Sequence, residues 1–331
     1  MIRGAQLAVQ DGPDAIEHDP YGGHEEGCRW VCATYKYHGD GVRTGALEFY
    51  GADERQVRRE RRVEWEPPVG ILDVRWAAPE TVVVVAGSDG SVWEVQNGKP
   101  VADACTRLLY KDEQRARVTL SVEVDRGLDG AGDRCVATFS DGAVGVLHRQ
   151  RPSLEWYAEQ AHAGEVWSCA FHPDAHGILS GADDGYVRGW DVRLASKRAS
   201  KRLELRPHQG LGVTSLHALS ATHFLTGGYD EWLRLWDERC LQQPLAALQL
   251  PGGVWRIQCR GTQWLCACMQ GGAAAGQWDG DELRLEQVLS MDTDAELVYG
   301  VAWLCAREGE KGPACVTSSF YEGTLCLWHN R

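Results

Sequence analysis

Short runs of alternating hydrophobic and polar residues dominate the chain. Residues 186–191 (YVRGWD) and 233–237 (LRLWD) alternate between two faces, as a half-buried strand does. Asp-Asp-Gly and Ser-Asp-Gly sequences, which favour tight turns, separate such runs. No segment keeps a helical period. Residues 53–66 (DERQVRRERRVEWE) have the polarity of a short helix, but among so many strands they favour an outer strand or a loop. The pattern predicts an all-β protein.

Two stretches of the chain repeat each other. Residues 178–193 (ILSGADDGYVRGWDVR) and 224–239 (FLTGGYDEWLRLWDER) align at one offset of 46 residues, which also separates His162 from His208 (208 − 162). This arrangement resembles the WD-repeat β-propeller, in which a unit of about 40–45 residues forms one four-stranded blade. The resemblance implies an all-β, seven-bladed WD-repeat β-propeller.

Seven units are expected within a single domain that covers residues 1–331, although only two carry the full repeat. The blades are predicted at about residues 14–60, 66–106, 116–150, 161–204, 207–246, 252–290 and 296–331. The last unit lacks an outer strand. Residues 5–9 (AQLAV) would supply this strand and close the ring without a free sheet edge.

Two sets of polar residues match the hydrogen-bonded tetrad of WD-repeat proteins, which joins a His, a Ser or Thr, an Asp and a Trp. The matching sets are His162, Ser180, Asp184 and Trp190, and His208, Thr226, Asp230 and Trp236. A structural role is expected for them, because buried polar groups are almost always paired. The last unit keeps Ser318 and Trp328, with Glu322 at the place of the tetrad Asp.

Composition narrows the classes of partner and compartment. The formal net charge of −13 argues against nucleic acid as the main partner, since phosphate binding needs a basic face. No stretch approaches the roughly 18 apolar residues of a membrane span, and the first residues lack the apolar region of a secretory signal. Twelve cysteines include no C-x-x-C pair. We therefore expect a cytoplasmic monomer with reduced thiols and neither a metal nor a cofactor.

The C-terminal half carries motifs outside the ordinary WD consensus. Residues 251–257 (PGGVWRI) and 296–303 (ELVYGVAW) follow a Y-D-E repeat and precede S-F-Y. From about residue 160 to residue 331 the sequence resembles the diphthine methyl ester hydrolase family of the diphthamide pathway. The resemblance implies that the protein binds translation elongation factor 2 and hydrolyses the methyl ester of its methylated diphthine, giving diphthine and methanol.

The residues alone do not identify a hydrolase. The nearest match to a serine esterase elbow is AGSDG (residues 86–90), whose Ser88 lies in a predicted hairpin turn rather than at a strand-to-helix elbow. The second position of the innermost strands is more informative. It holds Leu72, Trp167, Thr214, Trp255 and Tyr299. These residues either pack between blades or form an aromatic cage for a trimethylammonium cation.

The turn before the tetrad acid offers a second ring of candidates, on the face that carries that acid. It holds Ser88, Asp183, Tyr229 and Tyr321, which are either a solvated turn or a surface that faces a partner. The substrate-binding candidates are therefore Trp167, Trp255, Tyr299, Tyr229 and Tyr321.

Three residues are candidates for catalysis. Asp183 or Glu322 would serve as general base. Arg256 would stabilise an oxyanion, or else form an ion pair with a neighbouring blade, because strand alternation directs it away from Trp255.

Two other functions fit the same fold. A W-D-x-R ending occurs twice, at residues 190–193 and 236–239. Such endings are found in WD-repeat subunits that dock on ubiquitin-ligase scaffolds, so a non-enzymatic adaptor is the main alternative. Recognition of methylated lysine or arginine by the aromatic residues is a third.

Overall fold

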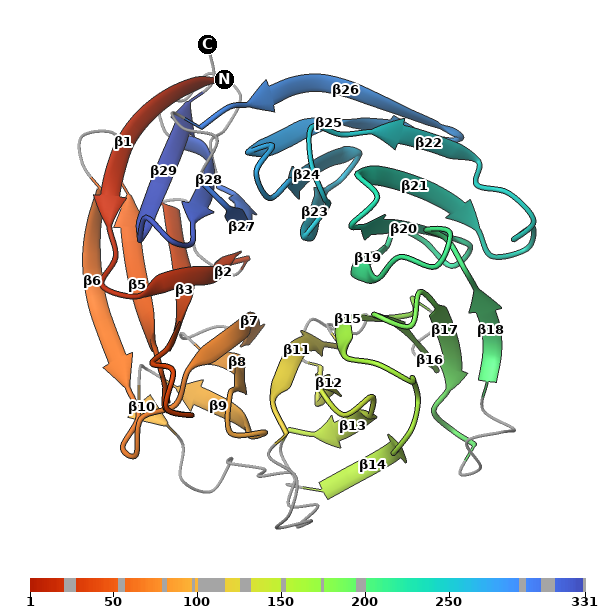
Figure 1. The fold of residues 1–331 in the computed structure, drawn as a ribbon, viewed down its shortest axis with the longest axis horizontal. Coiled ribbons are helices and arrows are strands. Elements are labelled where there is room, and N and C mark those ends of the chain that lie inside the picture. Colours follow the sequence, from red (N-terminus) through yellow and green to blue (C-terminus); the bar gives the residue numbers. More distant parts are fainter. Residues whose placement is uncertain are drawn as a thin grey trace.

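The strands form seven sheets arranged as blades around a common centre (Figure 1). The computed structural model describes residues 1–20, 28–52, 57–78, 82–96, 99–100, 117–125, 132–149, 153–173, 176–194, 201–291, 296–304 and 313–329. All regular elements in these ranges are strands, and the ranges contain no helix long and apolar enough to cross a membrane. The predicted seven-bladed propeller is confirmed.

The strands of each blade run outward from the centre in chain order. The first blade contains β2 (Gly12–His18), β3 (Cys28–Tyr37), β5 (Ala46–Ala52) and β6 (Val57–Glu64), with the short β4 (Arg43–Thr44) paired to β3. The second contains β7 (Ile71–Ala78), β8 (Val82–Gly87), β9 (Val92–Gln96) and β10 (Lys99–Pro100). The third contains β11 (Thr119–Val124), β12 (Arg134–Phe139), β13 (Val144–His148) and β14 (Ser153–Ala158).

The remaining four blades follow the same order. The fourth contains β15 (Val166–Phe171), β16 (Gly177–Ala182), β17 (Val187–Asp191) and β18 (Lys201–Leu205), and the fifth contains β19 (Val213–Ala218), β20 (His223–Gly228), β21 (Trp232–Asp237) and β22 (Ala246–Gln249). The sixth contains β23 (Arg256–Arg260), β24 (Gln263–Ala267), β25 (Ala273–Asp279) and β26 (Glu282–Leu289). The seventh contains β27 (Val298–Trp303), β28 (Pro313–Ser319) and β29 (Thr324–His329).

The N-terminal strand β1 (Ile2–Ala8) completes the seventh blade. It pairs antiparallel with β29, from Ile2 opposite His329 to Ala8 opposite Thr324. Two termini that are distant in the sequence therefore share one sheet, and the ring is closed by strand pairing. The closing strand was predicted at residues 5–9, and in the structure it begins earlier, at Ile2.

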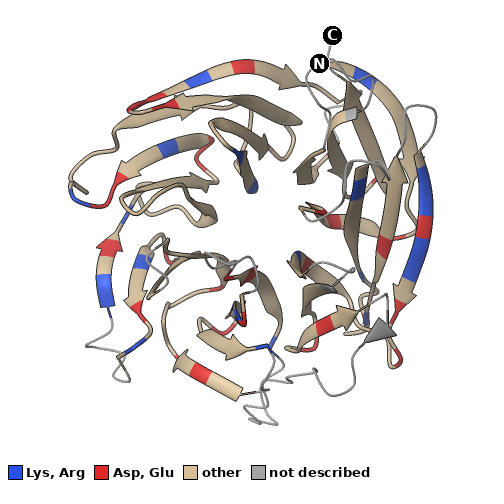
Figure 2. Ribbon diagram, turned by 180° about the vertical axis from the view of Figure 1, so that it is seen from behind, with Lys and Arg blue, Asp and Glu red and all other residues tan. Residues whose placement is uncertain are grey.

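Other strand bounds also differ from the sequence prediction. The third blade extends past residue 150, because its outer strand β14 lies at Ser153–Ala158. The polar segment within residues 53–66 forms the outer strand β6 where it is described, and charged side chains of both signs alternate along it (Figure 2). An outer strand with its side chains in water shows little hydrophobic pattern, so its ends are poorly marked in the sequence.

Apolar side chains fill the spaces between neighbouring blades. One cluster joins Phe49 of the first blade to Trp76 of the second, and another joins Trp30 of the first blade to Leu325 of the seventh. Trp30, Trp76 and Trp264 are among the largest fully buried side chains. This packing fixes the inner strands relative to one another, so residues at their inner ends hold a defined geometry.

The inner strands share a β-bulge near their first residue. Pairing with the next strand skips one residue in six of them, and a bulge redirects the skipped side chain. In the sixth blade Trp255 stands just before β23, and its N–H donates to Ala267 O at 2.9 Å. We call these residues the bulge ring: Asp14, Leu72, Leu120, Trp167, Thr214, Trp255 and Tyr299.

Candidate functional site

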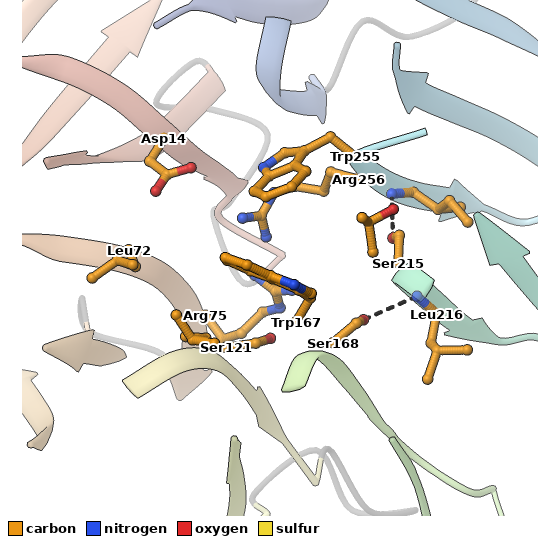
Figure 3. A pocket seen from close by; sticks show the side chains of 13 residues that line it. Asp14, Leu72, Arg75, Ser121, Trp167, Ser168, Ser215, Leu216, Trp255 and Arg256 are labelled. Atoms are coloured by element: carbon orange, nitrogen blue, oxygen red, sulfur yellow. Dashed lines mark hydrogen bonds between the residues drawn. The ribbon is translucent and has the colours of Figure 1, made fainter. Parts of the chain in front are cut away.

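A cavity of about 40 Å³ lies at the centre of the bulge ring (Figure 3). Every bulge-ring residue except Tyr299 lines it, together with Arg75 and Arg256. Its volume exceeds the roughly 15 Å³ that a single water needs, so it has room for water or a small polar group. The Asp14, Trp167 and Arg256 side chains point into the same space in Figure 3.

A row of aromatic side chains begins at this cavity, which Trp167 and Trp255 line. The ring centroids of Trp167 and Trp255 are 5.2 Å apart, those of Trp255 and Tyr299 are 4.8 Å apart, and those of Tyr299 and Phe320 are 5.2 Å apart. Tyr229 lies 6.4 Å from Trp255. The structure thus brings together the predicted substrate-binding aromatics from the channel column and from the turn ring. We call Trp167, Trp255, Tyr299 and Phe320 the aromatic row.

Phe320 is a member of the row that the sequence alignment missed. The Phe320 N–H donates to Leu297 O at 2.8 Å, as the Asp183 N–H donates to Glu165 O at 2.9 Å, so the two residues hold equivalent positions in their blades. Tyr321, which was aligned with Asp183, stands one residue further on. Its side chain is 71% exposed and its ring contacts Phe320 at 5.2 Å.

The same shift of one residue explains the tetrad position of the seventh blade. Trp328 Nε1 donates to Thr317 Oγ1 at 3.1 Å, so Thr317 and not Ser318 holds the hydroxyl position. Glu322 is correspondingly displaced from the place of the tetrad Asp. It is exposed in the turn after β28 and does not line the cavity. The longer turn between β28 and β29 hid this register from the sequence.

Asp183 lies at the rim rather than inside the cavity. It is exposed, and its Oδ1 accepts a hydrogen bond from Trp167 Nε1 at 2.8 Å. Burial and the nearby Asp183 charge raise the pKa of Glu165. Burial and Asp183 also raise the pKa of Tyr229 to about 12. The rim beside Trp167 and Tyr229 is therefore both aromatic and acidic, which suits a cation.

Asp14 is the acid inside the cavity, and the sequence did not single it out. Asp14 is 8% exposed. Burial raises the pKa of Asp14 from 3.8 to about 7, opposed by the Arg256 charge and by a hydrogen bond from Trp255, and reinforced by the Asp73 charge. A carboxyl group with a pKa near neutrality can accept a proton at physiological pH. Its signal lay in its place on β2, where it occupies the position that Trp167 and Tyr299 occupy on their strands.

Arg256 reaches the cavity despite the strand alternation that pointed it elsewhere. Trp255 stands before β23 and Arg256 begins it, and both line the cavity. Arg256 Nη1 donates to Asp73 Oδ1 at 2.8 Å. Asp73 lies on β7 of the second blade, so the ion pair crosses the centre rather than joining neighbouring blades. Figure 2 shows charged residues of both signs on the inner strands around the centre.

The Asp73 carboxylate is held by several donors. It accepts from Arg75 Nη1 at 2.7 Å, Ser121 Oγ at 2.9 Å and the Val122 N–H at 3.1 Å. The Arg256 and Arg75 charges hold the pKa of Asp73 below its ordinary value despite its burial. A buried Arg256 Nε finds no hydrogen-bond partner among the described residues. Arg256 is therefore held by Asp73 at Nη1, and its side chain lines the cavity.

Both tetrads form within their blades. In each, the His ring contacts the acid through Nδ1 and the hydroxyl through Nε2, and the Trp indole donates to the same hydroxyl. The distances are 3.0, 2.8 and 2.9 Å for His162–Asp184, His162–Ser180 and Trp190–Ser180. They are 2.7, 3.0 and 3.0 Å for His208–Asp230, His208–Thr226 and Trp236–Thr226. Burial lowers the pKa of both His rings. All their polar atoms are engaged, as a structural role requires.

Two further features concern metals and thiols. Within the described ranges no group of three or more His, Cys, Asp or Glu side chains is placed to hold a metal ion. The described cysteines are free thiols, and most are buried inside strands.

Comparison with known proteins supports the fold independently. Residues 156–191 and 200–237 match the family described as WD domain, G-beta repeat. The WD40 β-propeller domain of Doa1 superposes with a TM-score of 0.73, covering 100% of this chain and 98% of that one at 13% identity. Fold and site together define a WD-repeat β-propeller with an acid, a guanidinium and an aromatic row at its centre.

Curated relatives narrow the class further. The chain is 33% identical to human "Diphthine methyltransferase" over 82% of its own length and 65% of the relative's. It is 27% identical to "Diphthine methyltransferase homolog" of Dictyostelium discoideum, over 78% of this chain and 76% of that protein. It is 24% identical to "Diphthine methyltransferase" of Schizosaccharomyces pombe, over 87% of this chain and 86% of that protein. The chain thus spans slightly less than two thirds of the human protein. It is similar to WD-repeat proteins that carry the name diphthine methyltransferase.

Proposed function

We propose that the protein acts in diphthamide biosynthesis by hydrolysing the methyl ester of methylated diphthine on translation elongation factor 2. The names of the relatives support the pathway. The observation that carries the reaction is the placement of Asp14 beside Arg256 and Trp255 in one small cavity. A base, an oxyanion donor and an aromatic surface are what hydrolysis of a trimethylammonium ester requires.

Asp14 is the general base of the proposed reaction. It takes a proton from a water in the cavity as the water oxygen attacks the ester carbonyl carbon. The tetrahedral intermediate collapses when its C–OCH₃ bond breaks, and the proton on Asp14 passes to the departing methoxide. Ester and water become acid and methanol, so atoms and charge balance. Asp14 replaces Asp183 and Glu322 in this role, because neither of these lines the cavity.

Arg256 stabilises the charge that develops on the carbonyl oxygen. Its guanidinium is held by Asp73, and its side chain lines the cavity in which the ester would react. A donor that is already oriented needs no rearrangement during the reaction, and its removal typically costs about 10²–10³-fold in rate.

The aromatic row and the rim bind the trimethylammonium group. Trp167, Trp255 and Tyr299 present their rings beside the cavity, and Asp183 adds negative charge next to Trp167. Each ring–cation contact contributes roughly 0.5–2 kcal/mol. Tyr229 and Tyr321 extend the surface outward, where a protein substrate would be met first.

A mass-spectrometric assay tests this reaction. Purified protein is mixed with elongation factor 2 that carries methylated diphthine, and the modified peptide is followed with time, with and without an added methyl donor. Conversion of the methyl ester to the acid without a donor is expected. Asp14→Asn should abolish the conversion, whereas Glu282→Gln, a carboxyl change on the outer strand β26, should not. Methyl gain that depends on the donor would replace hydrolysis with the reaction that the relatives' name suggests.

A second function is supported by a separate feature. The W-D-x-R endings form two similar ion pairs, Arg193 with Asp191 at 2.6 Å and Arg239 with Asp237 at 2.6 Å. Both arginine side chains are largely exposed, at 60% and 69%. Such paired ends suit docking to a protein scaffold. Capture of a scaffold subunit that is lost in the double variant Arg193→Ala/Arg239→Ala, with no ester turnover, would favour the adaptor.

A further inference from the structure

Once a carboxylate enters the cavity, the negative groups in and around it outnumber the positive ones. Arg75 is matched by Asp73 at 2.7 Å and by Glu123 at 3.0 Å. Arg256 is matched by Asp73 alone and keeps a buried Nε without a partner in the described part of the chain. Among the described residues no ion pair with Asp14 is found, and the Arg256 charge acts on its carboxyl group. Arg256 and Asp14 thus line the same cavity as a cation and an acid.

Several other elements pack against Asp14. Asp73 on β7 is a second acid, and Cys32 on β3 and Tyr299 on β27 are neutral groups whose pKa values Asp14 helps to raise. Burial and Tyr321 contribute to the Tyr299 shift as well, and burial dominates that of Cys32. Arg256 is therefore the cation for which Asp14 and any bound carboxylate compete.

We propose that the cavity binds α-trimethylammonium carboxylates, with the carboxylate on Arg256 and the ammonium on the aromatic row, and that each is bound together with one proton on Asp14. The inference rests on the proposed function, since such a carboxylate is the product of the ester hydrolysis. Two carboxyl groups that share one small site cannot both ionise without a large penalty, so one of them keeps a proton.

The proton on Asp14 has a defined source and fate. The acid formed by hydrolysis gives its proton to Asp14, and the resulting carboxylate remains on Arg256. When Asp14 loses this proton to solvent, the two carboxylates repel each other and the product leaves. The ester substrate carries no negative charge at this position, so its binding needs no proton. The site would thus bind substrate and product through the same contacts, and the negative charge of the product would cause its release.

Two small probes test the inference without the elongation factor. Glycine betaine carries the quaternary ammonium and the carboxylate one carbon apart. Its amide keeps the cation and replaces the carboxylate with a neutral group. Isothermal titration calorimetry from pH 6 to pH 8.5 should show the betaine Kd rising by up to about tenfold per pH unit above the Asp14 pKa of about 7, with no such change for the amide. Titrations in two buffers of different ionisation enthalpy should show uptake of up to one proton for betaine and none for the amide.

A variant and the ester assay separate the possible failures. Asp14→Asn should bind betaine with a Kd that is independent of pH, and circular dichroism verifies its fold. If this variant does not fold, the two-buffer titration of the natural protein still shows whether betaine is bound together with a proton. Betaine binding that is equal at pH 6 and pH 8.5, or absent throughout, overturns the inference even if the ester is hydrolysed. Proton-linked betaine binding without ester turnover sustains it and overturns the hydrolase.

Discussion

Arg256 and Asp73 form an ion pair across the centre of the ring, with Nη1 at 2.8 Å from Oδ1. Their strands, β23 and β7, belong to the sixth and second blades. The contact orients the guanidinium so that its Nε is buried and has no hydrogen-bond partner within the described ranges. Asp73 is itself held from the third blade by Ser121 and Val122. Three blades therefore fix one donor.

Replacing Arg256 with Lys should lower kcat by about 10²–10³-fold. Lysine keeps the charge but cannot hold Asp73 and present a second oriented donor at the same time. Steady-state ester hydrolysis measures the effect. Arg284→Lys, an exposed change on β26, is the control and should keep the natural kcat. A kcat for Arg256→Lys equal to that of the control would remove Arg256 from oxyanion stabilisation.

Asp14→Asn should stabilise the fold above pH 7 while abolishing turnover. The folded-state pKa of Asp14, about 7, lies above its ordinary 3.8, so the folded protein holds a proton that the unfolded chain has lost. Stability therefore falls as pH rises between these values, by up to about 1.4 kcal/mol per pH unit, and the full penalty applies above pH 7. Denaturant unfolding at several pH values should show the advantage of the variant growing through this window. An advantage that is the same at pH 4 and pH 8 would contradict the raised pKa.

Trp255→Phe should move the rising limb of kcat/KM to higher pH. The Trp255 indole donates to the Asp14 carboxyl and lowers its pKa, so loss of the N–H raises the pKa of the base. A pH profile of ester hydrolysis measures the shift. Trp303→Phe makes the same change away from the cavity and should leave the profile in place. An unshifted profile for Trp255→Phe would mean that this hydrogen bond does not tune Asp14.

Tyr299→Leu should weaken binding of the cation selectively. The ring of Tyr299 stacks on that of Trp255, which lines the cavity, with 4.8 Å between the centroids. Loss of one ring–cation contact, roughly 0.5–2 kcal/mol, corresponds to a rise in KM of about 2- to 30-fold. The comparison is between a trimethylammonium ester and its uncharged tert-butyl isostere. Equal losses for both esters would show that Tyr299 packs against substrates without reading their charge.

Thr226→Val should destabilise the fifth blade without changing the chemistry. The Thr226 hydroxyl joins His208 and Trp236, and its loss leaves two buried donors or acceptors unpaired. A loss of about 1–3 kcal/mol is expected in the free energy of unfolding. Thr226→Ser keeps the hydroxyl and should retain most of this stability. A large fall in kcat/KM for folded Thr226→Val would give the tetrad a role beyond structure.

The repeat made most of the fold predictable, because its hydrogen bonds and turns are local. The Ser180 and Trp190 pair lies ten residues apart within one hairpin, and that spacing is visible in the sequence. The seventh blade was harder to align, since its longer turn shifts Phe320 and Thr317 by one residue from the expected register.

The site was less accessible than the fold, because its key contacts join distant blades. Arg256 and Asp73 are 183 residues apart in the chain, and no local pattern links them. Asp14 lies in a blade without the WD consensus, where the inner strand could not be recognised from its residues. Only its bulge, seen in the pairing of β2 with β3, shows that it shares the position of Trp167 and Tyr299.

The pairing of β1 with β29 sets the order in which the chain can mature during synthesis. β1 leaves the ribosome before its partner strand, Thr324–His329, which is made more than 300 residues later. Until then β1 has no sheet to join, and the seventh blade lacks its outer strand. Closure is a contact of very high sequence separation, which makes it a slow and late step of folding. A nascent chain must therefore carry β1 unpaired until β29 has been made, and the ring closes only after that.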